Sequence, residues 1–363
     1  MLATQRLSDP VLCKVLLNKL NDLLDRPLRF MEVCGTHTVS IFKSGITTLL
    51  PKGVDHLSGP GCPVCVTHDS EIELFLRFAA KPNVIIATFG DLMRVPGPNR
   101  KSLKHAQAEG ARISIIYSPM DILKIAIDNP KDIVILPGIG FETTAPTIAA
   151  TILMAEKEGI NNIAVIPCHK LVPPALEMLL ADPDCQIDGF LLPGHVSMVL
   201  GLDPYAFVVE KWGKPAIVSG FEPADILDAL CRMVKQLQTG EYKVENAYPR
   251  AVYQDGNPQA RNILYKVFQV GDAQWRGLGF LPMSGLTFRE QYKKFDALER
   301  FCITGADVHP NTGCICGEIL KGKVTPSACA LFGKDCTPEE PIGPCMVSTE
   351  GSCAAYFKYN MII

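Results

Sequence analysis

Short apolar runs alternate with helical stretches through the middle of the chain. This alternation limits the possible folds more than any other pattern in the sequence. The runs are rich in Val, Ile and Leu, and most are four to six residues long. Strands that are apolar throughout, rather than at every second residue, are typical of parallel sheets buried on both faces. We therefore predict an α/β fold. The predicted strands cover residues 29–33, 84–89, 113–117, 133–136, 163–167, 189–192 and 216–219.

About seven strands fit two small sheets more readily than one large sheet. We place the first α/β domain at residues 28–140 and the second at residues 141–235. After about Gly240 the predicted elements become short, and cysteines then crowd together. A helix predicted over residues 11–24 precedes the first sheet and is expected to pack with this tail. The third, irregular and cysteine-rich domain is accordingly predicted from residues 1–27 and 236–363.

Charge and hydropathy exclude several classes of function. The 363 residues carry a net charge of −3, so no surface for a polyanion is indicated and nucleic-acid binding is not expected. The sequence has no apolar run of 18 residues, and Met1–Asp9 lacks the apolar core of a signal peptide. We therefore expect neither a membrane span nor secretion, and a cytoplasmic location.

Six of the fourteen cysteines lie close together in the tail. In a reducing compartment such cysteines are more often metal-binding or redox-active than disulfide-bonded. The tail spacing matches neither a zinc ribbon nor a two-cluster ferredoxin, yet so many thiols among glycines and prolines favour an iron–sulfur site over zinc or reduced core cysteines. A [4Fe–4S] cluster takes four thiolates, which leaves two for a redox pair beside it. The six are Cys314, Cys316, Cys329, Cys336, Cys345 and Cys353.

Two further cysteine motifs lie near the N-terminus, after predicted strand-like runs. Gly59-Pro60-Gly61-Cys62-Pro63-Val64-Cys65 is a Cys-x-x-Cys loop that leads into a helical stretch. Cys62 and Cys65 can close a disulfide, hold one edge of a metal site or exchange disulfides with a partner. Cys34-Gly35-Thr36-His37-Thr38 follows a strand, where open α/β sheets bind ligands. Catalysis or ligand binding by Cys34 is favoured over a structural turn.

Three polar side chains elsewhere are candidates for the same chemistry. His37 is suited either to orienting a ligand or to capping a helix. His195, in Pro193-Gly194-His195-Val196-Ser197, is a candidate metal ligand or proton donor, although a lone histidine is more often structural. Glu142, in Gly140-Phe141-Glu142-Thr143-Thr144, offers a carboxylate or a helix cap. Neither a Walker A motif nor a complete GxGxxG is present, so no nucleotide site is predicted.

Taken together, these four motifs and the six-cysteine tail resemble the HypD family of [NiFe]-hydrogenase maturation proteins over essentially the whole chain. The resemblance implies two α/β domains and a third domain with a [4Fe–4S] cluster. It also implies a scaffold with redox and ligand-transfer activity rather than a simple turnover enzyme. On such a scaffold the Fe(CN)₂CO fragment is assembled with the chaperone HypC. Cyanide comes from HypE, and HypF acts upstream of HypE.

The resemblance also implies roles for individual residues. Cys34 would hold the transient Fe(CN)₂CO iron, and Cys62 and Cys65 would be the thiol redox pair. His37, His195 and Glu142 would lie near the iron. For the cluster we prefer the ligands Cys314, Cys329, Cys336 and Cys353, with Cys316 and Cys345 as the neighbouring pair; exchanging Cys314 with Cys316, or Cys345 with Cys353, is almost equally compatible with the sequence.

Two other functions are compatible with the same residues. A disulfide reductase linked to a cluster would use Cys62 and Cys65 on a soluble substrate. A zinc-stabilised interaction protein would use the tail cysteines for structure alone.

Overall fold

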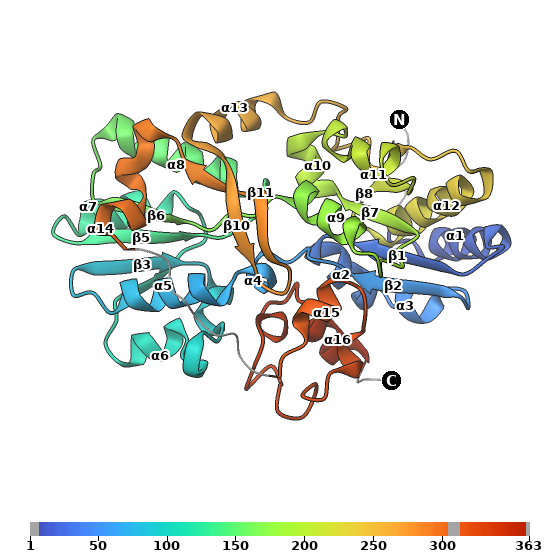
Figure 1. Ribbon diagram of the computed structural model, residues 1–363, viewed down its shortest axis with the longest axis horizontal. Coiled ribbons are helices and arrows are strands. Elements are labelled where there is room, and N and C mark those ends of the chain that lie inside the picture. The colour runs from blue at the N-terminus through green and yellow to red at the C-terminus, as the bar shows by residue number, and fades with distance from the viewer. Residues whose placement is uncertain (1–6, 304–312, 361–363) are drawn as a thin grey trace.

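The computed structural model describes residues 7–303 and 313–360. Two α/β lobes lie side by side, and the cysteine-rich tail lies below their junction (Figure 1). The first lobe is built on a sheet with the order β2-β1-β7-β8-β9, and the second on a sheet with the order β4-β3-β5-β6. The strands of both sheets pair in parallel, which confirms the predicted α/β fold with parallel sheets.

The first lobe carries two layers of helices around its sheet. Helices α1 and α12 pack against each other and against one face of the sheet, around buried Leu20, Phe30 and Leu230. Asp9 and Pro10 start α1, with the Asp9 carboxylate accepting from the Val11 N–H at 2.9 Å. The elements are α1 (Pro10–Leu23), β1 (Leu28–Glu32), α2 (Gly35–Lys43), α3 (Ile46–Leu49), β2 (Val54–Ser58), α4 (Pro63–Val66), α9 (Val172–Ala181), β7 (Gly189–Pro193), α10 (Gly194–Leu200), α11 (Ala206–Glu210), β8 (Ala216–Ser219), α12 (Pro223–Thr239) and β9 (Val244–Asn246).

The second lobe has the same plan with four strands. Its central strands β3 and β5 are buried on both faces, as their continuous apolar sequence predicts. The elements are α5 (Asp69–Ala79), β3 (Val84–Thr88), α6 (Leu103–Ala108), β4 (Ile113–Ile115), α7 (Asp121–Asp128), β5 (Ile133–Gly138), α8 (Ala145–Glu158) and β6 (Ile163–Pro167).

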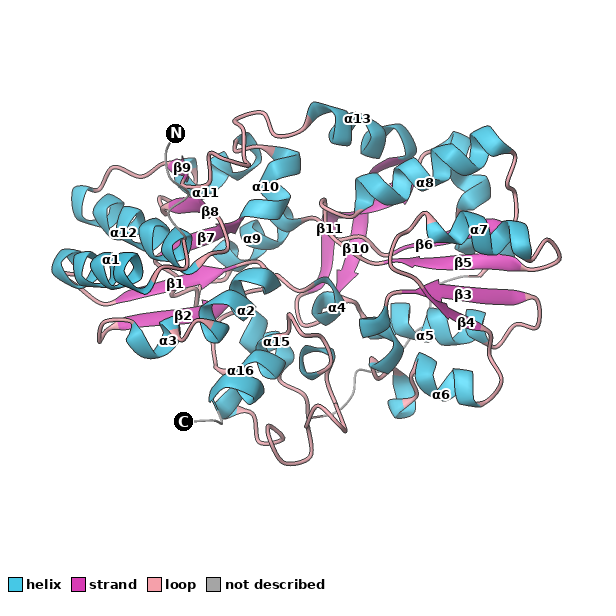
Figure 2. Cartoon of the chain, turned by 180° about the vertical axis from the view of Figure 1, so that it is seen from behind, coloured by secondary structure: helices cyan, strands magenta, loops and turns pink. Residues whose placement is uncertain are grey.

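A long antiparallel hairpin runs between the two lobes, as Figure 2 shows from the opposite side. Its strands are β10 (Phe268–Trp275) and β11 (Gly279–Phe288), preceded by α13 (Pro258–Val267) and followed by α14 (Ala297–Phe301). The buried Trp275 at its tip pairs with Thr67 in an isolated antiparallel bridge. The hairpin therefore connects to the segment that follows the Cys-x-x-Cys loop.

The tail from residue 313 has short helices and long turns. It contains α15 (Cys316–Leu320), two single-turn helices, η5 (Pro326–Ala328) and η6 (Pro344–Met346), and α16 (Ser352–Asn360). The two longer helices contact the first lobe, with Leu320 joining the core that includes Met31 and α16 packing on α2. Among the described residues, no helix combines the length and the apolar character that crossing a membrane would require.

The expected domain boundaries differ from the observed lobes. A boundary at residue 140 separates β5 from β6, which are neighbours in one sheet, and assigns β1 and β7 to different domains although they pair. Helix α1 packs on α12 rather than on the tail. Residues 236–303 add β9 to the first lobe and α13 and α14 to the second. The alternation of strands and helices predicts local elements, but strand pairing is decided by contacts between distant segments.

Candidate functional site

Three of the turns singled out in the sequence meet at the carboxyl edge of the first sheet, together with a fourth turn at Gly220-Phe221. Strands β2, β1, β7 and β8 are successive neighbours there. They end at the Gly59–Cys65 loop, at Cys34, at Gly194-His195 and at Gly220-Phe221, respectively. The carboxyl ends of parallel strands are where α/β sheets place their ligands. Sheet topology thus gathers motifs that are separated by up to about 190 residues.

Cys34 occupies the N-cap position of α2 and is only 8% exposed. Its backbone N–H donates to Oε2 of the fully buried Glu32 at 2.9 Å, and Thr38 Oγ1 donates to Oε1 of the same carboxylate at 2.5 Å. Burial raises the pKa of the Cys34 thiol to about 12, with smaller contributions from the charges of Glu350 and Glu32. The free thiol is therefore protonated at neutral pH, and a bound cation is needed to make it a thiolate.

The Cys-x-x-Cys loop lies directly against the backbone of Cys34. Gly35 N–H donates to the Gly61 carbonyl at 2.9 Å, and a Cβ at position 61 would come within 2.2 Å of the Cys34 nitrogen. Only glycine permits this approach, which explains the glycine before Cys62. The thiol motifs of β1 and β2 are thus held together by main-chain contact.

Cys62 and Cys65 are joined by a disulfide across α4, and both are buried. The Cys65 N–H also lies 3.2 Å from Cys62 Sγ, as expected for a sulfur at a helix N-cap. Helix α4 contacts η6, which carries Cys345, and the disulfide shares one apolar cluster with Cys316 and Cys345. The loop is therefore sandwiched between Cys34 and the tail thiols.

The two predicted histidines gather around the ring of Phe221. His37 is fully buried, and its Nε2 lies 2.9 Å from the Gly220 carbonyl, so this nitrogen carries the proton. Its Nδ1 is buried without a hydrogen-bond partner, which leaves a lone pair available for a ligand. Burial lowers the pKa of His37 to about 4, so the ring is neutral. The exposed His195 stacks on Phe221 with a centroid separation of 4.0 Å.

Glu142 approaches from the second lobe, after β5. It is 1% exposed; its Oε1 accepts from the Val172 N–H at 2.9 Å, and its Oε2 has no partner. Burial raises its pKa to about 7. The buried Tyr205 lies within electrostatic range of both Glu142 and Cys34.

The six tail thiols line one small cavity together with aliphatic side chains and Phe332. Cys316 shares hydrogen bonds with Cys314 and with Cys345. Burial raises the pKa of Cys353 well above its usual value, and the nearby Cys314, Cys336, Cys316 and Cys329 raise it further.

The chemistry of this donor set is that of an iron–sulfur cluster site. Across residues 7–303 and 313–360, no three His, Cys, Asp or Glu side chains are placed to hold one metal ion. Thiolates that hold a [4Fe–4S] cluster bind different iron atoms and need not converge on one point. Gly343 also leaves space beside the thiols, because a Cβ there would meet Cys314 Sγ at 2.8 Å. The residues present therefore fit a cluster by their chemistry and their arrangement around one cavity.

The hairpin places a buried cation between the disulfide segment and the tail. Arg276 donates from its backbone to the Val66 carbonyl, from Nε to the Thr67 carbonyl, both at 2.9 Å, and from Nη2 to Asp69 Oδ1 at 2.5 Å. The hydrogen bond with Cys316 and burial raise the pKa of Cys314, and the positive charge of Arg276 lowers it by a smaller amount. The guanidinium therefore also lies near the cavity lined by the tail thiols. The next residue, Gly277, packs on the backbone of Gly317 in α15.

Sequence reasoning missed several residues of this site. Glu32 lies only two residues before Cys34, so a charged residue inside an apolar strand was the signal that could have identified it. Glu350 accepts from Thr36 Oγ1 at 2.8 Å, and its position within the cysteine tail was a weaker signal. Phe221 and Arg276 have no such local signal, because their roles depend on strands that are distant in sequence.

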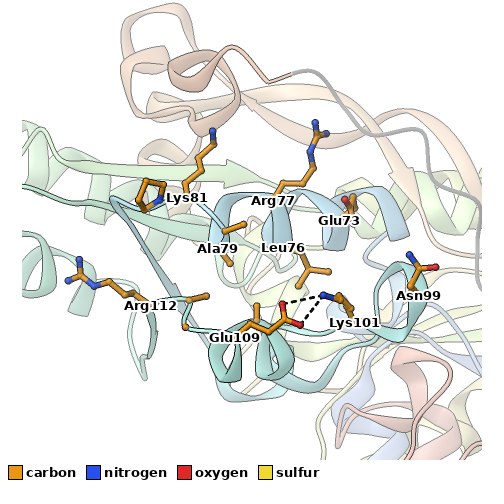
Figure 3. A pocket seen from close by; sticks show the side chains of 14 residues that line it. Glu73, Leu76, Arg77, Ala79, Lys81, Asn99, Lys101, Glu109 and Arg112 are labelled. Atoms are coloured by element: carbon orange, nitrogen blue, oxygen red, sulfur yellow. Dashed lines mark hydrogen bonds and ion pairs between the residues drawn. The ribbon is translucent and has the colours of Figure 1, made fainter.

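A separate hollow of about 590 Å³ lies on the second lobe between α5 and α6 (Figure 3). Its rim carries Arg77, Lys81 and Arg112, and an ion pair joins Lys101 to Glu109 at 2.9 Å. None of the residues predicted from the sequence lines this hollow, so we place the functional site at the junction of the lobes and the tail.

Fold and site together define a class: a two-lobed α/β protein in which a buried strand-end cysteine, an internal disulfide and a six-thiol pocket adjoin one another. Comparison with known proteins specifies the class further. The HypD family model, described as "Hydrogenase formation hypA family", matches residues 11–360. The chain belongs to the HypD family of hydrogenase maturation factors.

Curated relatives from several bacteria match this chain over most of their own length. The chain is 46% identical to hydrogenase maturation factor HypD of Escherichia coli K12 over 337 residues, covering 93% of this chain and 90% of the relative. It is 45% identical to HypD2 of Bradyrhizobium diazoefficiens, covering 92% and 90%, and 44% identical to HypD of Rhodobacter capsulatus, covering 97% and 96%. The resemblance seen in the sequence is therefore confirmed at the level of the family.

Proposed function

We propose that this hydrogenase maturation factor is a redox-active scaffold on which the Fe(CN)₂CO unit of [NiFe]-hydrogenase is assembled. A HypC-type chaperone shares the iron with Cys34, and a HypE-type protein, supplied by a HypF-type protein, donates cyanide. The iron is the cargo of the scaffold and not a resident cofactor. Thiolate is a soft donor that suits iron with strong-field ligands.

The observation that carries the proposal is the main-chain contact between the Cys34 turn and the Cys62–Cys65 loop. A Cys-x-x-Cys pair held against the turn of another cysteine is positioned to act on whatever that cysteine binds. Cleavage of an S–CN bond with transfer of cyanide to iron consumes two electrons. Oxidation of the Cys62–Cys65 dithiol to the disulfide releases two electrons and two protons.

The polar residues around Cys34 support the same assignment. His37 Nδ1 offers a lone pair, and Glu142 carries an unpartnered oxygen and a pKa of about 7, which suits a group that accepts or delivers protons. His195 is exposed at the rim, where it can meet a partner protein. These three residues would orient the cargo or move protons, while Cys34 holds it.

The tail would renew the thiol pair. We propose Cys314, Cys329, Cys336 and Cys353 as the residues that hold a [4Fe–4S] cluster, which would supply one-electron chemistry when bound. Cys316 and Cys345 then remain as a pair, supported by their mutual hydrogen bond and their place in one apolar cluster with the Cys62–Cys65 disulfide. A cluster-linked reductase of soluble disulfides is less compatible, because both sulfurs of that disulfide are buried.

Infrared spectroscopy of the complex with the HypC-type chaperone tests the role of Cys34. After anaerobic purification with its partners, the native protein is expected to show CO and CN stretching bands. The Cys34→Ala protein is expected to lose these bands because the iron loses a thiolate ligand, while its cluster iron and labile sulfide stay unchanged. Cys302→Ala, at an exposed cysteine outside these motifs, is the control. Unchanged bands in Cys34→Ala would remove Cys34 from the proposal.

A further inference from the structure

The tip of the β10–β11 hairpin lies between the Cys62–Cys65 disulfide and the tail thiols. It ends beside α4 and next to the tail helix α15 (Figure 1). Trp275 at the tip belongs to one apolar cluster with both cysteines of the disulfide and with two tail cysteines. On the tail side, a Cβ at Gly277 would lie only 2.5 Å from the Cα of Gly317. The tip therefore touches the main chain directly after Cys316.

Arg276 is the cation of this tip, and its side chain is 7% exposed. Its backbone N–H donates to the Val66 carbonyl and its Nε to the Thr67 carbonyl, one and two residues after Cys65. Nη2 donates to the Asp69 carboxylate. A guanidinium presents its donors in a rigid plane, so these bonds fix its orientation as well as its position. The positive charge is therefore held inside the junction.

This charge acts on the tail thiols. Hydrogen bonds among Cys314, Cys316 and Cys345 have the largest effects on the pKa values of these three thiols, and the charge of Arg276 lowers all three pKa values. Among the charges that change these pKa values most, Arg276 is present and its partner Asp69 is absent. The guanidinium thus acts on the tail more strongly than the carboxylate with which it is paired.

A fixed positive charge favours the electron-rich state of a redox group beside it. When the tail takes up one electron from a low-potential one-electron donor and no proton follows, its charge becomes more negative by one. A buried cation stabilises that additional charge more than a cation in water would, because the surroundings screen it less. The reduction potential of an iron–sulfur group depends on net charge in this way.

We propose that Arg276 is a positioning residue for electron uptake, whose buried charge raises the reduction potential of the iron–sulfur group held by the tail cysteines. This rests on the cluster assigned to the tail under the proposed function, and it adds the residue that sets how readily electrons enter. Arg276 is also fixed to the segment that follows Cys65. The charge therefore lies between the group that takes up electrons and the disulfide that two electrons and two protons convert to a dithiol.

The test measures the reduction potential of the anaerobically purified full chain with its bound iron and without partner proteins. Titration with dithionite in the presence of mediators, followed by electron paramagnetic resonance, gives the midpoint. Arg276→Gln removes the charge and is expected to lower the equilibrium constant for reduction at least about tenfold, or about 59 mV for a one-electron couple. Arg276→Lys keeps the charge, and we expect its constant to stay within about threefold of the native value.

Asp69→Asn separates an effect of charge from a loss of structure. It removes the negative partner but keeps an oxygen that accepts from Arg276, so its reduction potential is expected to rise. Loosening of the hairpin would instead shift Arg276→Gln and Asp69→Asn in the same direction. Lys170→Gln is the matched control, because it breaks the other buried ion pair of the first turn of α5, in which Lys170 Nζ lies 2.5 Å from Glu71 Oε1. Its potential is expected to be native.

The possible outcomes separate the role of Arg276 from the presence of the cluster. A native potential in Arg276→Gln, or shifts of the same sign in Arg276→Gln and Asp69→Asn, would overturn the role of Arg276 and leave the cluster in place. If Arg276→Gln holds no iron, Asp69→Asn decides, because a potential at or below the native value would overturn the proposal. A native chain that holds no iron would overturn this proposal and the cluster of the proposed function together.

Discussion

At the scale of single residues, the site depends on a thiol that its surroundings keep protonated. Burial holds the pKa of Cys34 at about 12, compared with a usual value of 9.0. At pH 8 we expect Cys34 to react with iodoacetamide about a thousandfold more slowly than an unperturbed thiol, because its thiolate fraction is smaller by that factor. Mass spectrometry of the alkylated peptides measures the rate, and the exposed Cys302 is the internal control. Equal rates for the two cysteines would contradict the buried, protonated thiol.

Glu142 makes stability depend on pH. Its folded pKa of about 7 lies above the usual 4.5, so burial of this carboxyl stabilises the fold fully below pH 4.5, and the contribution is lost as pH rises through 7. The difference corresponds to about 3 kcal/mol. Relative to the native chain, Glu142→Gln is expected to be more stable at pH 8 by a similar amount and to gain little at pH 5. Urea unfolding at both values measures this, and an equal difference at the two values would refute it.

At the scale of elements, the β10–β11 hairpin depends on one buried ion pair. The side chains of Arg276 and Asp69 are 7% and 4% exposed. Arg276→Met is expected to destabilise the protein by about 3–5 kcal/mol, because it leaves the Asp69 carboxylate unpaired inside the molecule. Thermal and urea unfolding measure the loss. The double variant Arg276→Met with Asp69→Asn should recover part of it, whereas additive losses would show that the pair is not coupled.

Elements also show where the sequence was sufficient for prediction. Seven predicted strands overlap observed ones, because continuous apolar runs such as Val84–Thr88 are buried on both faces and carry their own signal. Their distribution between the two sheets was wrong, because nothing local to β1 indicates that β7 is its partner. The hairpin was missed for a related reason. Eight of its eighteen strand residues are exposed, and the buried Trp275 and Arg276 contact Thr67 and Asp69, about 207 residues earlier in the chain.

At the scale of the whole molecule, the tail joins the core of the first lobe through Leu320 and Cys345 and forms a small core of its own elsewhere. Cys336 and Met346 belong to a small apolar cluster of their own, apart from the four larger clusters of buried residues. Cys329→Ala removes one of the proposed cluster ligands without touching the sheets. We expect it to lose about four irons and four labile sulfides per chain, with the broad absorbance near 400 nm. Its far-ultraviolet circular dichroism should stay native, and retained iron would exclude Cys329 as a ligand.

The pairing of β1 with β7 also bears on the order in which the chain folds as it leaves the ribosome. β1 ends at Glu32, but β7 begins only at Gly189, whereas the four strands of the second sheet are contiguous between Val84 and Pro167. At 5–20 residues per second, roughly 8–30 s separate the emergence of β1 from that of β7. The four strands of the second sheet can therefore pair first. During that interval Cys34, Cys62 and Cys65 are already outside the ribosome, still without the sheet that later shields them, and exposed to oxidants and stray metal ions.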